Sequence, residues 1–220
     1  EELGLFELGK LAGEIDEKRI ASTVKATLDA GAGVVGTMEL WEVLFGSRTG
    51  AEWKALRPEV KYVPPGMVQQ WTTGADQRSQ QLGQHPKAVD NILQLRRKVL
   101  KALHDADVPV LLGTDSPQVF SVPGFSIHHE MRLMTEAGLT PWEILEAGTR
   151  RVAEFYGQAD DFGTVAPGRR ADLVLLDANP LSNVAHFAKR AGVMVGGRWL
   201  SEKDIQARLV TIAASMAKGG

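Results

Sequence analysis

Cysteine is absent from the 220 residues of this chain, which excludes disulfides, zinc–thiolate sites and a cysteine nucleophile. An excess of one charge is also lacking, because the formal net charge is −2 and basic residues are scattered, apart from short runs such as 96–98. That distribution disfavours nucleic acid as a partner. No apolar run approaches the roughly 18 residues of a membrane-spanning helix. We therefore expect no nucleic-acid partner and no membrane partner.

The N-terminus has neither a methionine nor the basic-then-apolar pattern of a secretion signal. A chain that opens on Glu1 is expected to be processed or to be a piece of a longer protein. Its 44% hydrophobic residues suffice for a packed core in one or two domains. The lack of cysteine fixes no compartment, and our expectation is a cytoplasmic location.

Helical and strand patterns alternate along the chain. Helices are predicted over residues 3–15, 18–30, 86–106, 127–137, 141–156 and 202–216. Asp16 is the predicted N-cap of the second helix, and Thr140, with Glu143 three residues later, is the predicted cap of the fifth. Apolar stretches at 33–38 and 108–114 predict buried strands, and the helix between them implies that the two are parallel neighbours. Short strands are predicted at 162–165, 171–176 and 193–195. The stretch 47–83 is predicted to be a long loop-and-helix insertion of the kind that covers a site.

Asp115 is the first candidate for chemistry, because it follows the apolar strand 108–114. Parallel α/β folds place reactive groups at the carboxyl ends of their strands. A carboxylate there can bind a metal or accept a proton from water. The alternative is that Asp115 only caps a turn beside Pro117.

The five histidines do not form a recognisable metal motif such as His-x-His; they are His85, His104, His128, His129 and His186. His128 and His129 are adjacent, so they point to different faces of a helix, and a packing or solvent role is favoured for both. Glu39 and Glu42 flank Trp41 after the first strand. They either face a substrate at the mouth of a barrel or occupy a first helical turn, where the helix dipole favours acids.

Four segments, in order, resemble the C-terminal part of the amidohydrolase superfamily, and its imidazolonepropionase-like and prolidase-like members in particular. They are VPVLLGTDS at 108–116, HEMRLMTEAGLTPWEILEAGT at 129–149, DFGTVAPGRRADLVLLDANP at 161–180 and VMVGGRW at 193–199. The first resembles the eighth barrel strand with its aspartate, and the third resembles the return into a small β-sandwich. Residues 31–38 fit the seventh strand more loosely.

The resemblance implies an α/β fold: the C-terminal part of a (β/α)8 TIM-barrel metallo-hydrolase over 1–157, part of a small β-sandwich over 158–200 and a C-terminal helix over 201–220. The family's His-x-His pair, strand-four ligand and later histidines have no counterpart in this sequence. Of the family's metal ligands and catalytic groups, only the strand-eight aspartate maps, onto Asp115. A complete barrel also needs roughly 250 residues.

By this resemblance, the complete enzyme is a hydrolase that uses a divalent metal, zinc in our expectation, to attack an amide, cyclic amide or dipeptide C–N bond with activated water. Asp115 would bind the metal and carry the proton to the leaving nitrogen. The 120–125 loop and the Trp41 to Trp71 insertion would shape the pocket for a small-molecule substrate. The alternative is a non-catalytic remnant or assembly module. In either case we expect self-association or pairing with the missing half of the barrel.

Overall fold

A computed structural model describes residues 5–218. At its centre is a two-stranded parallel sheet, in which Val34 and Val35 of β1 (Val34–Val35) pair with Val110 and Leu111 of β2 (Val110–Leu111). The predicted parallel pairing is therefore confirmed, but both strands are shorter than predicted. After β1 the backbone turns at Thr37 (φ 44°), and α3 (Met38–Phe45) begins at once.

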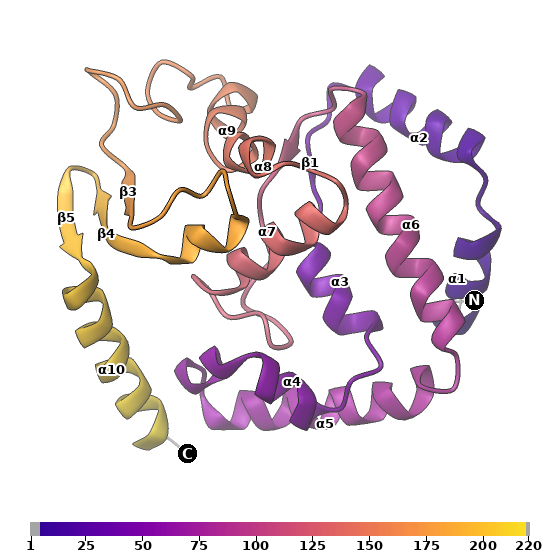
Figure 1. Cartoon of the computed structure of the whole chain (residues 1–220). Coiled ribbons are helices and arrows are strands. Elements are labelled where there is room, and N and C mark those ends of the chain that lie inside the picture. Colours follow the sequence, from indigo (N-terminus) through magenta and orange to yellow (C-terminus); the bar gives the residue numbers. More distant parts are fainter. Residues whose placement is uncertain (1–4, 219–220) are drawn as a thin grey trace.

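Three helices lie on one side of the molecule (Figure 1). They are α1 (Leu5–Glu14), α2 (Glu17–Asp29) and α6 (Pro86–Asp105). Helix α6 packs against β2, and the other two pack against α6. The predicted N-cap of α2 is confirmed, because Asp16 accepts a hydrogen bond of 2.8 Å from the Arg19 amide. The main core joins the inner faces of α2 and α6 to the strands and to α7 (Ser126–Glu136), through residues such as Leu100, Val110 and Leu133.

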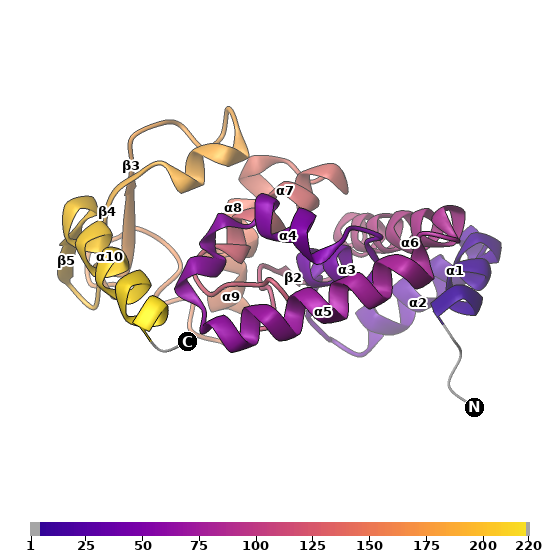
Figure 2. The ribbon, with the colours of Figure 1, turned by 90° about the horizontal axis from the view of Figure 1, so that it is seen from below.

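The insertion is more regular than predicted. It consists of α4 (Gly50–Leu56), the 3-10 helix η1 (Pro58–Tyr62) and α5 (Pro65–Leu82), which runs along one edge of the molecule (Figure 2). Trp53 and Trp71 from the insertion pack against Phe120 of the loop after β2, with ring centroids 6.4 Å and 5.8 Å from that ring. This second core fixes the insertion to the loop that carries Asp115.

The single helix predicted over 141–156 is wrong, because the structure has two helices, α8 (Pro141–Ala147) and α9 (Arg150–Phe155). The interruption falls at Gly148 and Thr149, where the Thr149 backbone leaves the helical region (φ −135°, ψ −94°). The predicted cap of α8 is confirmed: Thr140 and Glu143 form a reciprocal capping box, which satisfies the amides of the first turn.

The C-terminal part is an antiparallel sheet in the order β3 (Leu173–Leu176), β4 (Arg190–Val195) and β5 (Arg198–Ser201), with η2 (Val184–Ala188) and α10 (Glu202–Lys218). It lies at the end of the molecule opposite α1 and α2 (Figures 1 and 2). The predicted strand at 162–165 is wrong, because Gly163 (φ 93°) and Gly168 (φ 83°) turn the chain there. Among the helices of residues 5–218, none has the length and apolarity that crossing a membrane requires.

Candidate active site

Asp115 lies on the loop between β2 and α7, and its side chain is exposed to solvent. The Gln118 amide nitrogen donates to the Asp115 carboxylate at 2.6 Å and to the Asp115 carbonyl at 3.0 Å. The backbone is left-handed at Asp115 (φ 58°) and again at Val119 and Phe120, a conformation that side chains with a Cβ seldom adopt. The carboxylate is thus displayed on a specifically shaped loop and is accessible to a ligand.

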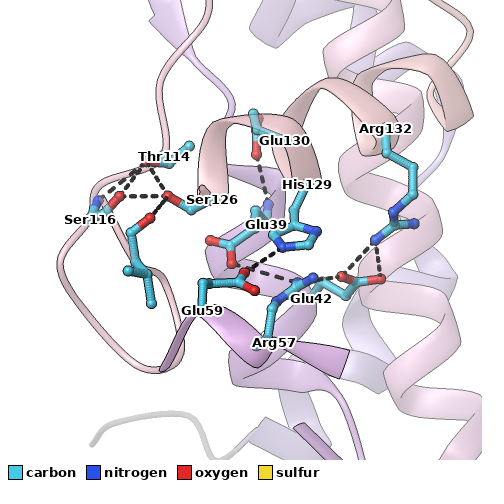
Figure 3. Close-up of polar contacts among 11 residues, drawn as sticks. Glu39, Glu42, Arg57, Glu59, Thr114, Ser116, Ser126, His129, Glu130 and Arg132 are labelled. Carbon is cyan, nitrogen blue, oxygen red and sulfur yellow. Dashed lines mark hydrogen bonds and ion pairs between the residues drawn. The ribbon is translucent and has the colours of Figure 1, made fainter. Parts of the chain in front are cut away.

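Three hydroxyl groups hold this loop to the start of α7 (Figure 3). The Ser116 hydroxyl lies 2.6 Å from that of Thr114 and 2.7 Å from that of Ser126. Ser126 is buried, and its hydroxyl also donates to the Val122 carbonyl at 3.0 Å. Both chain neighbours of Asp115 are therefore tied to the same helix. We call Thr114, Ser116 and Ser126 the hydroxyl triad.

The aromatic residues expected to shape a substrate pocket are mostly part of the interior, which corrects that expectation. Phe120 is 0% exposed and Trp53 only 1%. Tyr62 and Phe125 stack on each other with centroids 5.1 Å apart. Phe120 and Phe125 belong to the segment between β2 and α7, so these ring contacts hold the Asp115 loop against the insertion.

A buried group of charged residues lies beside the loop, between α3, η1 and α7 (Figure 3). Glu130 of α7 is 1% exposed, and its carboxylate accepts a hydrogen bond of 2.7 Å from the Glu39 amide in the first turn of α3. The N-cap residue of α3, Thr37, makes no capping bond with its own side chain. Glu130 therefore caps α3 from a distant helix, where a negative charge is favoured by the helix dipole.

Arg57 joins the insertion to the same group. Its guanidinium lies 3.3 Å from the Glu42 carboxylate and 3.6 Å from the Glu39 carboxylate. Glu42 also accepts from Arg132 at 2.9 Å, and Glu59 lies 2.7 Å from the His129 imidazole. Glu39 is therefore a buried first-turn acid, so its predicted substrate-facing role is wrong and the helix-turn alternative is confirmed.

Sequence reasoning missed Arg57, Glu59, Glu130 and the triad member Ser126. No local motif marks them, since their partners come from other elements; Glu130 and Glu39, for example, are 91 positions apart.

Burial raises the pKa of Glu39 to about 7, although the nearby Arg57 charge acts in the opposite direction. Burial likewise raises the pKa of Glu130 to about 7, against the hydrogen bonds from backbone amides. Burial lowers the pKa of Arg57 for the same physical reason, since each charged form loses its hydration.

These shifts predict that the free energy of unfolding falls as the pH rises from about 4.5 to about 7. In this window the folded chain holds protons on Glu39 and Glu130 that the unfolded chain has released, so raising the pH favours unfolding. Urea denaturation at several pH values measures the effect. The double variant Glu39→Gln, Glu130→Gln is expected to flatten the profile, whereas the exposed control Glu14→Gln leaves it unchanged. An unaltered slope in the double variant would contradict the assignment.

The other histidines are engaged separately. His104 of α6 lies 3.0 Å from the Glu143 carboxylate, and His186 Nδ1 is 2.8 Å from the Asn179 carbonyl oxygen. Burial, together with the charge of Arg190, lowers the pKa of His128. His129 contacts the Glu59 carboxylate, and His85 directly precedes α6.

A metal site does not fit the residues that the structure describes. Within 5–218, no three His, Asp or Glu side chains gather as metal ligands. Asp115 is a single carboxylate, and its nearest polar partner is an amide donor. Tight zinc sites use three or four protein ligands, so this part of the chain does not complete one.

We accordingly predict that the 220-residue chain binds zinc only weakly. Dialysis against a mild chelator, followed by metal analysis, should leave far less than one zinc per chain, since a lone carboxylate forms no tight site. Stoichiometric zinc after dialysis would contradict this prediction and would point to a site that includes His128 or His129.

Comparison with known proteins gives consistent matches. A family model described as the Amidohydrolase family matches residues 67–200, more than half of the chain. The imidazolonepropionase of Hahella chejuensis is 31% identical over 159 residues, which are 70% of this chain and 37% of that protein. The imidazolonepropionase of Shouchella clausii is 36% identical over 117 residues, 48% of this chain and 26% of that protein.

Among solved structures, a bottromycin amidohydrolase superposes with a TM-score of 0.64 at 24% identity, covering 93% of this chain and 46% of that one. A Xaa-Pro dipeptidase superposes with a TM-score of 0.53 at 16% identity, covering 86% of this chain and 38% of that one. These likenesses support a fold related to the TIM barrel. The chain spans less than half of the length of each of these proteins.

Proposed function

Because the chain belongs to the amidohydrolase family, we propose that it is the C-terminal portion of a hydrolase that cleaves C–N bonds in small molecules. The observation that carries the proposal is the exposed Asp115 carboxylate, held on a shaped loop after β2. Cyclic amides are the first substrate class to test, since imidazolonepropionases are among the relatives above 30% identity. Linear amides and dipeptides come next.

The proposed role of Asp115 is proton transfer. As a water oxygen forms a bond to the amide carbon, the Asp115 carboxylate accepts a proton from that water. It then returns the proton to the nitrogen as the C–N bond breaks, which releases a neutral amine from a linear amide and opens the ring of a cyclic amide. A divalent metal, zinc in our expectation, would require ligands beyond those that residues 5–218 supply.

The experiment is a hydrolysis assay on the natural-length protein with a panel of cyclic amides, linear amides and dipeptides, in which the mass of the product shows the addition of one water across the C–N bond. Turnover of any class that depends on Asp115 supports the proposal. The intact mass of the natural protein should be measured in parallel, because a longer chain is needed to complete a barrel.

The second candidate function is a non-catalytic remnant or assembly module. It is favoured by the lack of a metal-ligand group within the described part of the chain. A natural protein with the mass of this chain and no turnover in the panel would support it over the hydrolase.

We also predict that the isolated chain self-associates or aggregates. Two parallel strands cannot close a barrel, and exposed strand edges favour pairing with other chains. The side chains of Val35 in β1 and of Val174 and Leu175 in β3 are 48%, 58% and 56% exposed. Light scattering on a size-exclusion column is the measurement, and a monodisperse monomer with a cooperative melting transition would contradict the prediction.

A further inference from the structure

The three hydroxyls of the hydroxyl triad lie within hydrogen-bond distance of one another. Each hydroxyl carries one proton, and that of Ser126 has two acceptors in reach, the Val122 carbonyl at 3.0 Å and the Thr114 hydroxyl at 3.2 Å. With either acceptor, the Ser116 hydroxyl donates to Ser126 at 2.7 Å, and the Thr114 hydroxyl donates to Ser116 at 2.6 Å. Every proton is used once, and the chain of hydrogen bonds runs from the Asp115 loop into the first turn of α7.

These hydrogen bonds place Asp115 between two anchored residues. Thr114 and Ser116 flank it in sequence, and both reach Ser126, whose side chain is almost wholly buried at 1% exposure. The left-handed backbone at Asp115 persists only where its surroundings hold it. At the far end of the loop, the buried Phe120 ring supplies the second anchor.

We propose that Thr114, Ser116 and Ser126 are positioning residues that fix the direction of the Asp115 carboxylate, with Ser126 as the link to the rigid helix α7. The value of this inference for catalysis rests on the proposed function. The triad itself touches neither the substrate nor the reacting atoms. It acts by keeping the proton acceptor in one orientation, and small misplacements of such a group slow turnover without a matching loss of binding.

The test uses paired variants of the same residue. Thr114→Val removes the hydroxyl at nearly constant shape, whereas Thr114→Ser keeps it. Ser126→Ala removes the link to α7. Ser116→Ala removes a hydroxyl that is partly exposed, so this variant does not alter a buried side chain and should fold normally. Thr135→Val is the control. It removes an exposed hydroxyl from the same helix, α7, and this hydroxyl donates to the Met131 carbonyl and not to the Asp115 loop.

Hydrogen exchange of the amides in 113–122 is the first readout. Thr114→Val, Ser116→Ala and Ser126→Ala are expected to speed exchange in this loop by roughly tenfold or more, because local opening becomes easier. Thr114→Ser and Thr135→Val should exchange like the unaltered protein. Unchanged exchange rates in this loop for all three hydroxyl-deleting variants overturn the proposal. Amide exchange in Thr114→Ser that is as fast as in Thr114→Val also overturns it.

Steady-state kinetics of the natural-length protein are the second readout. The three deletions should lower kcat by about tenfold to a hundredfold, with KM within about twofold, and Thr114→Ser should restore kcat. Equal effects on kcat in Thr114→Val and Thr114→Ser overturn the positioning role. If Asp115→Asn keeps full turnover, the proposed function fails instead, and the exchange experiment still decides whether the triad orders the loop.

Discussion

The Asp115→Asn variant of the natural-length protein is expected to lose roughly 10²–10⁴-fold in kcat, the usual worth of general acid–base catalysis. Asparagine keeps the size and one oxygen of the side chain, and it tolerates the left-handed backbone at this position. It cannot take a proton from water. KM should change much less, since the interactions that bind substrate and transition state equally are preserved.

A matched control comes from Asp107, which is also exposed and left-handed, with φ 58°. Asp107→Asn makes the same chemical change in a similar backbone at the turn before β2, and its kcat should be normal. If Asp115 only caps a turn, its replacement lowers stability by about 1 kcal/mol and leaves turnover intact. Near-normal kcat with a lowered melting temperature would therefore remove Asp115 from the mechanism.

Arg57→Ala is expected to lower the free energy of unfolding by about 3–5 kcal/mol, because removing one partner leaves buried carboxylates without a compensating charge. Arg57 is 3% exposed, and its guanidinium serves both Glu39 and Glu42. It also covers the Trp53 ring at 5.5 Å. Urea denaturation at pH 8, where Glu39 is mostly ionised in the folded chain, measures the loss.

Two comparisons identify the cause of that loss. Adding Glu39→Gln to Arg57→Ala should recover part of the stability, since it removes one of the uncompensated charges. Lys25→Ala breaks the exposed i,i+4 pair with Asp29, in which the lysine side chain is 74% exposed, and should cost about 0.5 kcal/mol or less. A loss in Arg57→Ala as small as that of Lys25→Ala would show that the buried ion pairs contribute little.

Periodic and local signals predicted much of the fold. The parallel pairing of β1 with β2, the helix between them and the caps at Asp16 and Thr140 all depend on residues close in sequence or on simple chirality rules. The strand predicted at 162–165 failed because glycine φ angles decide between a strand and a turn there. An apolar run alone does not specify those angles.

The site was predictable only at its single exposed carboxylate. Asp115 could be placed because it follows an apolar strand, whereas the surroundings of Glu39 depend on Arg57 and Glu130, which belong to other elements. Nothing in the local sequence of Glu39 indicates that its carboxylate is buried. Likewise, the local sequence of Ser126 indicates only a serine at the start of a helix, and its contacts with Thr114 and Ser116 depend on the fold.

The cap that Glu130 provides for α3 also has a consequence for the order of events during synthesis. The hydrogen bond joins residues 91 positions apart, so α3 emerges from the ribosome long before its cap exists. Until α7 has been made, the first turn of α3 must rely on water for its amides, and the Val34–Val35 strand lacks its parallel partner. The N-terminal half is therefore expected to complete its packing only after about residue 130 has left the exit tunnel.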